Sequence, residues 1–548
     1  MPVFAPPAAA GLIRRRRFIF CRKPAARNRP AGLAASLLFT PVLGIFLLAM
    51  PDCGTAEDAS ATVPPAAPAN PFLVIPQPKL LHPGAGTFVW PANVPWRLAG
   101  PVRDERLWDA AGGLLSAQAG HFMARREAWF SVEIGTPSQP EFPAGTNLPA
   151  WAANAEGYRL SVTTNGIVIL ASTAQGAFYG LQTLAQLTET DGHTFTCPAV
   201  EVEDWPSLGF RGVHWFPSAS GVPMYRHLIE NVFSSFKFNH CVIQCEAARW
   251  DSHPEIAMTN SISKADLRAL VGLCRHRFLE PIPLVDVPGH VDWMFRHGQN
   301  LDLAEDAETP YACCVNNPRA IKMIEDVMTE CIEVFHPQTF HIGHDEITLR
   351  GRFPSPDCPY CHAETVTRLM AESANRLADW LAARGIATMI WGDMLLAPAE
   401  AADAANAKTV AEAKERRAAI SQRITITDWH YIWNADDRSL KALQADGFHT
   451  IAATWREPVN IFRFSKAAVA TGSDGLLQTT WDGYFPDERE LKRDLDQFTA
   501  YVIAADYAWS GRVDPPAKLG YAAQEVFLKA YAGQFAPHRT NSGNASAF

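Results

Sequence analysis

The chain has 548 residues, of which 48% are hydrophobic and 19% charged, so it is not an intrinsically disordered protein and its length predicts two or more domains. The formal net charge is −9, but residues 1–50 carry eight basic and no acidic side chains, and the remaining 40 basic residues face 57 acidic ones, a balance of −17. An acidic body of this kind argues against nucleic acid or an anionic surface as a partner.

The N-terminus has the order of a targeting segment. A basic stretch precedes an apolar run over residues 31–50, and small residues follow it. This order is typical of a signal peptide, while the length of the run also suits a retained membrane anchor. Both interpretations of residues 1–56 stay open, as does lipidation of Cys53. In each case we expect an exported protein that is periplasmic, extracellular or surface-anchored.

An Ala- and Pro-rich linker over residues 57–70 is expected to lead into a first, smaller domain over residues 71–205. Alternating apolar residues flank Asn165-Gly166, which is a hairpin signal. Residues 174–189 then carry apolar side chains at helical spacing. Because strand and helix patterns mix here, we expect an α+β domain.

From residue 206 to residue 535, short apolar runs alternate with helical stretches such as 264–277, 318–335 and 365–384. The runs cover residues 210–215, 241–245, 282–287, 339–343, 388–391, 424–429, 450–455 and 475–481. Eight strand–helix units predict an α/β fold, a (β/α)8 TIM barrel, with residues 536–548 as a flexible tail. The active site of such a barrel lies at the carboxyl ends of its strands.

The predicted strand ends carry many polar and aromatic residues. Four of them are tryptophans, one at each of the last four strands: Trp391, Trp429, Trp455 and Trp481. A single tryptophan there would most often be core packing. Four at the same topological position favour a sugar pocket, because the C–H faces of a pyranose stack on aromatic rings.

Two adjacent carboxylates, Asp345 and Glu346, follow the fourth strand. Like charges repel, so one alternative is a pair that points to opposite faces, one member salt-bridged and the other solvated. The surrounding motif, residues 341–346 with the sequence His-Ile-Gly-His-Asp-Glu, favours a catalytic pair. It resembles the His-x-Gly-Gly-Asp-Glu motif of glycoside hydrolase family 20, the β-N-acetylhexosaminidases, with His344 in place of the second Gly.

The resemblance extends over about residues 72–510. Residues 72–81 and 156–187 resemble the N-terminal domain of the family, residues 204–215 resemble the segment that opens the barrel, and residues 283–293 resemble its third-strand motif. The motifs occur in the order of the family, which makes coincidence improbable.

The resemblance implies a retaining exo-glycosidase that removes terminal β-linked N-acetylhexosamine by substrate-assisted catalysis. Glu346 would act as acid and then as base, and Asp345 would hold the acetamido N–H. The other residues expected to bind the sugar are Arg211, Asp286, His290, His341, Trp391, Trp429, Trp455, Trp481 and Asp482. The partner would be an N-acetylhexosamine-containing glycan, with no cofactor and no catalytic metal, and with membrane contact only through an uncleaved anchor.

Three departures from the family pattern leave the substrate open. Gln244 and Glu246 end the second strand, Arg456 replaces a Tyr after Trp455, and Asp482 follows Trp481. Tyr431 or Tyr484 could replace the missing Tyr, which in the family hydrogen-bonds the acetamido oxygen. A catalytically impaired carbohydrate-binding barrel and a glycosidase with altered sugar specificity therefore remain as alternatives, and the linkage and oligomeric state stay open.

The eleven cysteines include a CxxC pair, Cys358 and Cys361. A local disulfide or free thiols, a zinc site and redox chemistry are all compatible with that pair. A closed zinc site needs four ligands, which Cys313, Cys314 and His362 could complete. The sequence does not show whether these residues lie close together.

Overall fold

The computed structural model describes residues 71–91, 97–99, 104–115, 130–134, 148–190, 194–401 and 403–535. The expected leader over residues 1–56, the linker over 57–70 and the tail over 536–548 lie outside the described residues. Among the residues that the structure describes, no helix is both long enough and apolar enough to cross a membrane.

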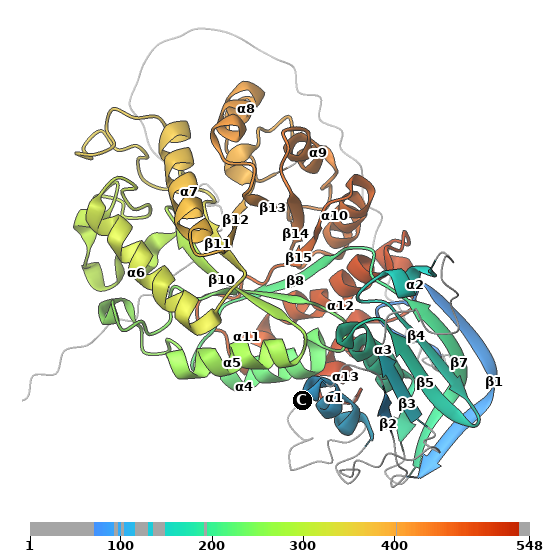
Figure 1. Cartoon of the computed structure of the whole chain (residues 1–548). Coiled ribbons are helices and arrows are strands. Elements are labelled where there is room, and N and C mark those ends of the chain that lie inside the picture. The colour runs from blue at the N-terminus through green and yellow to red at the C-terminus, as the bar shows by residue number, and fades with distance from the viewer. Residues whose placement is uncertain are drawn as a thin grey trace, which may run out of the picture. The chain divides into compact units, whose positions relative to one another are not determined.

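The first domain is a seven-stranded sheet in the order β1-β7-β4-β5-β3-β2, with β6 paired to β7 (Figure 1). Its strands are β1 Leu80–Pro91, β2 Arg97–Ala99, β3 Phe130–Ile134, β4 Tyr158–Thr163, β5 Gly166–Ala171, β6 Glu189–Thr190 and β7 Thr194–Asp204. Its helices are α1 Glu105–Leu115, α2 Ala150–Ala153 and α3 Ala174–Leu187. Helix α3 packs on β3, β4 and β5, and α1 packs on α3, so the helices cover the sheet.

The predicted hairpin is β4–β5, in which Thr163 pairs with Gly166. Buried and partly exposed residues alternate along both strands, as expected for strands with one face on a core. Thr173 then caps α3, because its side chain accepts a hydrogen bond from the N–H of Gly176. The predicted hairpin and the helix that follows it are both confirmed.

The second domain is a closed barrel of eight parallel strands, which confirms the predicted fold class (Figure 1). In chain order they are β8 Phe210–Trp215, β9 His240–Gln244, β10 Glu280–Val287, β11 Thr339–Gly343, β12 Ala387–Trp391, β13 Thr425–Trp429, β14 Thr450–Thr454 and β15 Gly475–Gln478. Each strand begins within two residues of the start of its predicted run. The last strand, β15, ends three residues before the end of its predicted run.

Helices surround the strands on the outside of the barrel (Figure 1). They are α4 Val222–His227, α5 Lys264–His276, α6 Pro318–Phe335, α7 Val366–Ala382, α8 Val410–Ala419, α9 Arg438–Ala445, α10 Pro458–Thr471, α11 Glu488–Arg493, α12 Leu495–Ser510 and α13 Ala523–Tyr531. Single turns are η1 Leu228–Phe233, η2 Pro254–Ile256, η3 Val291–Trp293, η4 Arg296–Gly298, η5 Leu301–Leu303, η6 Asp393–Leu395 and η7 Pro516–Lys518. Ser263, Asn317 and Thr365 each accept a backbone N–H at the start of the three predicted helices, α5, α6 and α7, which explains where these begin.

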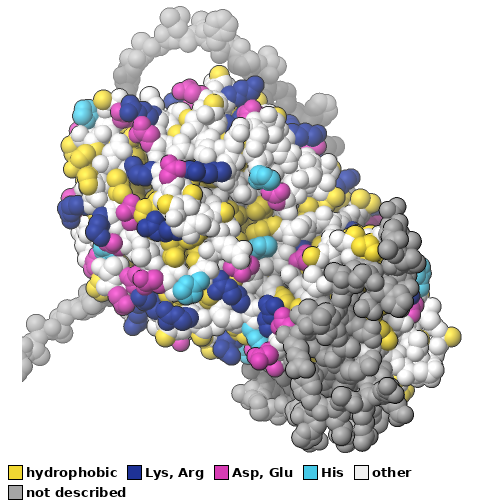
Figure 2. Space-filling view, in the orientation of Figure 1, with side chains coloured by type: hydrophobic (Ala, Val, Ile, Leu, Met, Phe, Trp, Pro, Cys, Tyr) yellow, Lys and Arg dark blue, Asp and Glu magenta, His cyan; other side chains and the backbone are white. Residues whose placement is uncertain are grey.

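Apolar side chains from five strands fill the barrel interior. They are Val242, Ile282, Leu284, Met389, Trp391, Ile451, Ala453 and Leu477. The interior is therefore a packed core and no channel, as is usual for this fold, and any site must lie above it at the strand ends. On the face drawn in Figure 2, Lys and Arg side chains are interspersed with Asp and Glu over the barrel helices.

A buried charge network joins the two domains. Arg211 pairs with Glu156 at 2.7 Å, and Lys237 pairs with Asp204 at 2.9 Å. Trp509 of α12 lies between the pairs, with the Arg211 guanidinium 4.8 Å and the Lys237 ammonium 4.5 Å from its ring. Lys237 and Asp204 are fully buried, so each charge depends on the other for compensation.

This network corrects the role expected for Arg211. The residue lies at the amino-terminal end of β8, the opposite end from an active site in this fold. Its guanidinium also donates to the carbonyls of Lys237 and Leu208, and its side chain is 1% exposed. Arg211 therefore anchors the first domain to the barrel and is not placed to grip sugar hydroxyls.

Lys237→Met should destabilise the protein strongly, because it keeps the apolar stem and leaves the Asp204 carboxylate buried without its cation. Breaking one side of a buried pair costs about 3–5 kcal/mol. The measurement is the urea midpoint followed by tryptophan fluorescence. Lys322→Met is the control, since Lys322 is 72% exposed and its loss should cost less than about 0.5 kcal/mol. Equal midpoints for the two variants would contradict the role given to the network.

Candidate active site

The carboxyl ends of β10 and β11 bring the predicted pair together with His290. Asp345 and Glu346 follow β11, and His290 follows β10. The Nε2 atom of His290 lies 3.4 Å from Oδ2 of Asp345 and 3.2 Å from Oε2 of Glu346. One imidazole therefore faces both carboxylates.

The backbone of Glu346 is held from two sides. Its φ angle is 45°, in the left-handed region that non-glycine residues adopt at a cost. Its N–H donates to Oδ2 of Asp393 at 2.9 Å, and its carbonyl accepts the Tyr311 hydroxyl at 3.2 Å. Its side chain is 29% exposed, so a strained but fixed backbone presents a carboxyl group to the barrel mouth.

Asp345 lies deeper than Glu346 and faces Asp286. One carboxyl oxygen on each aspartate has no donor within the described part of the chain. Burial, followed by the nearby Asp345 charge, raises the pKa of Asp286 well above its usual value. A protonated Asp286 is placed to donate to Asp345, and this interaction lowers the pKa of Asp345 against the larger rise caused by burial.

Gly343 permits this approach between Asp286 and β11. A Cβ atom at position 343 would stand 1.7 Å from Oδ1 of Asp286, and φ is +67°. Both space and backbone angle therefore require glycine at the end of the strand.

The local charges set the protonation of His290. Burial disfavours the imidazolium, but Asp345, Glu346 and Asp393 outweigh burial and raise the pKa of His290 to about 9. Burial, and then the Asp345 charge, raise the pKa of Asp393 to about 7. Burial raises the pKa of Asp345 as well, and the His290 charge opposes that rise, so a cationic His290 favours the ionised form of Asp345.

The two histidines of the motif are buried and neutral. His341 lies inside the barrel, where its Nδ1 accepts the N–H of Gly343 at 3.1 Å and its ring packs on Trp391 at 4.4 Å. His344, with φ of 72°, turns away toward α7 and lies 3.3 Å from the Ser373 hydroxyl. Burial lowers the pKa of both imidazoles, that of His344 to about 4.

The predicted tryptophans gather around Tyr431, which follows β13. The Trp481 indole N–H donates to the Tyr431 hydroxyl at 3.0 Å. The Tyr431 ring lies 4.8 Å from that of Trp429 and 5.7 Å from that of Trp455. Trp391 is 1% exposed and lies 6.0 Å from Trp481, so it forms the deepest part of this aromatic group.

The aromatic group connects to the carboxylates through Asp393. The Trp429 indole N–H donates to Oδ1 of Asp393 at 3.1 Å, and the other oxygen of Asp393 holds Glu346. Burial has the largest effect and raises the pKa of Tyr431. Its hydrogen bonds lower that pKa and the charge on Asp345 raises it, and the net result is a rise. Tyr431 is therefore a neutral hydroxyl close to Asp345.

Arg456 lies at the exposed edge of the aromatic group around Tyr431. Its guanidinium stacks over Trp455 at 4.5 Å and pairs with Asp496 at 3.4 Å, and its side chain is 46% exposed. Tyr484, the other candidate for the missing hydroxyl, packs on Phe216 at 5.2 Å and under Arg296 at 5.1 Å. The geometry therefore favours Tyr431 over Tyr484.

The second strand ends in a hydrogen-bonded chain. Gln244 bonds to His214 at 3.1 Å and donates to Glu246 at 2.9 Å. Glu246 is fully buried, and burial raises its pKa to about 7. The charge on Glu246 also contributes to the raised pKa of Asp286. Glu246, which departs from the family pattern, therefore belongs to the same cluster of carboxyl groups as Asp286 and Asp345.

The structure corrects the expectation for Asp482. Its side chain is 2% exposed and lies 3.4 Å from Arg493 of α11. Burial, and then a hydrogen bond with Asp494, raise its pKa to about 7. Asp482 therefore makes polar contacts with Arg493 and Asp494, at the end of α11.

Sequence reasoning did not select Asp393, Tyr311 and Asn406. Asp393 had a signal, since it follows Trp391-Gly392 at a strand end, and Asn406 donates to its carboxylate at 2.5 Å. Tyr311 lies in the long loop after β10, where no periodicity or motif points to it. Its role depends on a contact between two loops.

The His290 titration gives a direct test of this site. Because its pKa rises from about 6.5 to about 9, the imidazolium contributes stability that is complete below pH 6.5 and lost as pH rises through 9. Asp345→Asn removes one carboxylate and should lower the His290 pKa by about 1–3 pH units. NMR of labelled histidine checks this, with Asp326→Asn as the control. An unchanged His290 titration in Asp345→Asn would contradict the geometry.

Solved structures share this fold. A β-N-acetylhexosaminidase from Bacteroides fragilis gives a TM-score of 0.64 at 16% identity, over 84% of this chain and 96% of that chain. An exo β-N-acetylglucosaminidase from Vibrio harveyi, in complex with N-acetylglucosamine, gives 0.64 at 15% identity, over 87% and 79%. At these identities the likeness establishes the fold alone.

Curated relatives match parts of the chain. A lacto-N-biosidase from Bifidobacterium bifidum is 21% identical over 367 residues, which is 64% of this chain and 30% of the relative. A β-hexosaminidase from Porphyromonas gingivalis is 26% identical over 254 residues, or 39% and 32%. The human β-hexosaminidase subunit beta is 26% identical over 363 residues, or 59% and 63%. The chain thus spans about a third of the length of the first two of these relatives.

Two family models match the two domains in order. One is described as glycosyl hydrolase family 20, domain 2, and matches residues 72–205. The other is described as glycosyl hydrolase family 20, catalytic domain, and matches residues 240–482, which include the Asp345–Glu346 motif. Together they span well over half of the chain. The chain therefore belongs to glycoside hydrolase family 20.

Proposed function

We propose that this protein is a retaining exo-glycosidase that removes terminal β-linked N-acetylhexosamine by substrate-assisted catalysis. The observation that carries the proposal is the different setting of two adjacent carboxyl groups. Asp345 is buried against Asp286 and His290, whereas Glu346 reaches the barrel mouth from a fixed backbone. Environments that separate two carboxyl groups in this way assign them separate roles.

In the first step the acetamido oxygen of the sugar attacks its own anomeric carbon as the glycosidic bond breaks. Glu346 gives its proton to the leaving oxygen. Asp345 accepts the acetamido N–H and stabilises the positive charge that develops on the cyclic intermediate. The nucleophile is already part of the bound sugar, so its proximity supplies much of the rate.

In the second step Glu346 takes a proton from water, which attacks the anomeric carbon and opens the intermediate with net retention. Asp345 must stay ionised throughout. The His290 imidazolium, which lies 3.4 Å from Oδ2 of Asp345, and the interaction with Asp286 favour that state, since each lowers the pKa of Asp345.

Tyr431 is proposed as the donor to the acetamido oxygen. Its hydroxyl accepts the Trp481 N–H at 3.0 Å and the Thr479 hydroxyl at 3.4 Å, which leaves its own proton without an acceptor among the described residues and available to a ligand. Trp429, Trp455 and Trp481 surround it with ring faces suited to a pyranose. The names of the relatives and the N-acetylglucosamine bound to the Vibrio harveyi enzyme support a 2-acetamido sugar as substrate.

Export is part of the proposal and rests on the sequence alone. The basic stretch, the apolar run over residues 31–50 and the small residues after it have the order of a signal peptide or anchor. An exported enzyme would meet glycans outside the cytoplasm.

Glu346→Gln should reduce hydrolysis of an aryl β-N-acetylglucosaminide by about 10²–10⁴-fold, because it removes the proton donor and the later base. The loss should be larger for a phenyl leaving group than for a dinitrophenyl group, which needs little protonation. Asp345→Asn should lose about 10²–10³-fold for both leaving groups alike. Steady-state kinetics on the two substrates separates these patterns.

Glu372→Gln on the exposed face of α7 is the control and should keep full activity. A thiazoline that mimics the cyclic intermediate should inhibit the unaltered enzyme competitively. Full activity of Glu346→Gln would overturn the assignment. Sugar binding without turnover of any aryl glycoside would favour a binding protein, and equal turnover of an aryl glucoside would favour an altered sugar specificity.

Tyr431→Phe removes one hydroxyl and leaves the aromatic packing in place. Loss of a donor to developing charge costs about 10²–10³-fold in kcat, and thiazoline affinity should fall with it. Tyr507→Phe is the matched control, because it loses one hydrogen bond to the Asp514 carbonyl outside the site. A large loss in Tyr484→Phe and none in Tyr431→Phe would assign the donor to Tyr484.

A further inference from the structure

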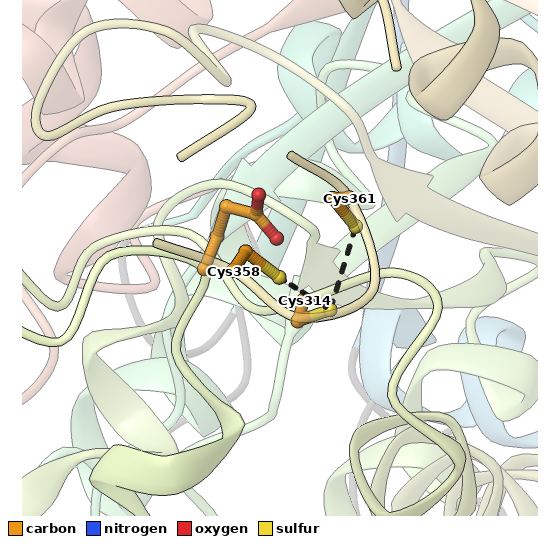
Figure 3. Close-up of side chains that lie close together, drawn as sticks. Cys314, Cys358 and Cys361 are labelled. Atoms are coloured by element: carbon orange, nitrogen blue, oxygen red, sulfur yellow. Dashed lines mark hydrogen bonds between the residues drawn. The ribbon is translucent and has the colours of Figure 1, made fainter. Parts of the chain in front are cut away.

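Three cysteines and one glutamate meet where the loop after β10 approaches the loop after β11. We name Glu305, Cys314, Cys358 and Cys361 the Cys3Glu cluster. All four residues are buried, and one potential ligand atom from each lies within 4.8 Å of all the others. Figure 3 shows the sulfur atoms of the three cysteines turned toward one another from separate stretches of chain.

The sulfur spacing suits ligands around one metal ion. The sulfur of Cys314 lies 3.4 Å from that of Cys358 and 3.5 Å from that of Cys361. A disulfide bond is about 2.0 Å long, and all three cysteines are free thiols. Thiolates at 2.3 Å from a tetrahedral zinc ion lie about 3.8 Å apart. A small contraction or expansion of this cluster therefore accommodates zinc.

Glu305 provides a fourth ligand. Its Oε1 accepts the N–H of Ser355 at 2.8 Å, and its Oε2 has no donor among the described residues. The residue is only 3% exposed. A buried carboxylate oxygen without a donor is costly, and beside three sulfurs the missing partner is best supplied by a cation.

Backbone groups support thiolate ligands in this cluster. The N–H of Asn316 lies close to the sulfur of Cys314, and the N–H of Tyr360 lies close to that of Cys358. Each donor lies two residues after its cysteine, so both turns aim N–H groups at sulfur. Such outer hydrogen bonds orient ligands and stabilise their charge.

The structure changes the ligand set that sequence suggested. Cys314 takes part, but its neighbour Cys313 does not belong to the cluster. The Nδ1 of His362 bonds to the Cys358 carbonyl at 2.8 Å, which turns that ring to a backbone contact. Glu305 replaces them, and no spacing rule connects it to the CxxC pair.

We propose that the Cys3Glu cluster binds one structural zinc ion. Thiolate-rich sites select zinc over magnesium or calcium, and four protein ligands complete a tetrahedron. A closed, buried set leaves no position for water or substrate, so the ion acts in structure and not in the reaction. The proposal is independent of the proposed glycosidase activity.

The ion would link the two loops that build the catalytic centre. Glu305 and Cys314 belong to the loop between β10 and α6, which also carries His290 and Tyr311. Cys358 and Cys361 belong to the next loop, which begins at His344 and joins β11 to α7. The Tyr311–Glu346 bond joins the same loops, as does the Arg352–Asp306 pair at 2.9 Å. Zinc would fix this arrangement.

The test begins with metal analysis of the unaltered full chain, purified without metal-affinity resin. About one zinc per chain is expected by mass spectrometry of the elements. Cobalt(II) exchanged into the protein should give thiolate charge-transfer bands and the strong visible bands of a tetrahedral site. These readouts need no variant and no activity assay.

Cys361→Ser should lose zinc, and Glu305→Gln should release it to a chelator faster than the unaltered chain does. Cys313→Ser is the matched control, because it removes a buried thiol next to Cys314 and should retain the full zinc content. Chelation should lower the melting temperature of the unaltered protein and of Cys313→Ser.

Two results would overturn the proposal even if Cys361→Ser fails to fold. One is folded, unaltered protein without zinc that also takes up no cobalt at the cluster. The other is a Cys358–Cys361 disulfide in the native protein, detected by mass after alkylation. Neither result would alter the outcome expected for Glu346→Gln, so failures of the two proposals are distinguishable.

Discussion

The proposed catalytic centre depends on how several carboxyl groups are kept close together at the mouth of one barrel. Asp286, Asp345 and Asp393 follow or end three consecutive strands, and closure of the sheet forces them to meet. Three buried negative charges would repel one another strongly. A proton on Asp286 and the charge on His290 relieve that repulsion, so the protonation pattern is a consequence of the fold.

A short stretch of backbone adopts unfavourable φ angles to hold this geometry. Gly343, His344 and Glu346 all have positive φ angles, as does His290 across the mouth. Such a turn persists only where neighbours fix it. Asp393 and Tyr311 bind the two sides of Glu346, and each comes from a different loop. The precision of the acid therefore depends on loop packing, which is where the Cys3Glu cluster lies.

The sequence predicted the fold well, because strand and helix periods are local properties. It also found the carboxylates and tryptophans, since strand ends converge in a closed barrel. It misplaced Arg211 and Asp482, whose partners come from the first domain and from α11. It could not find Tyr311 or Glu305 either. These roles depend on contacts between segments far apart in the chain, which no local pattern encodes.

Under the proposed function, Tyr431 takes the place of the Tyr that Arg456 replaces after Trp455. Tyr431 comes from the adjacent strand and places a hydroxyl among the same tryptophans. Arg456 itself stacks on Trp455 and pairs with Asp496 at the surface. The reacting centre needs only a donor at one point in space.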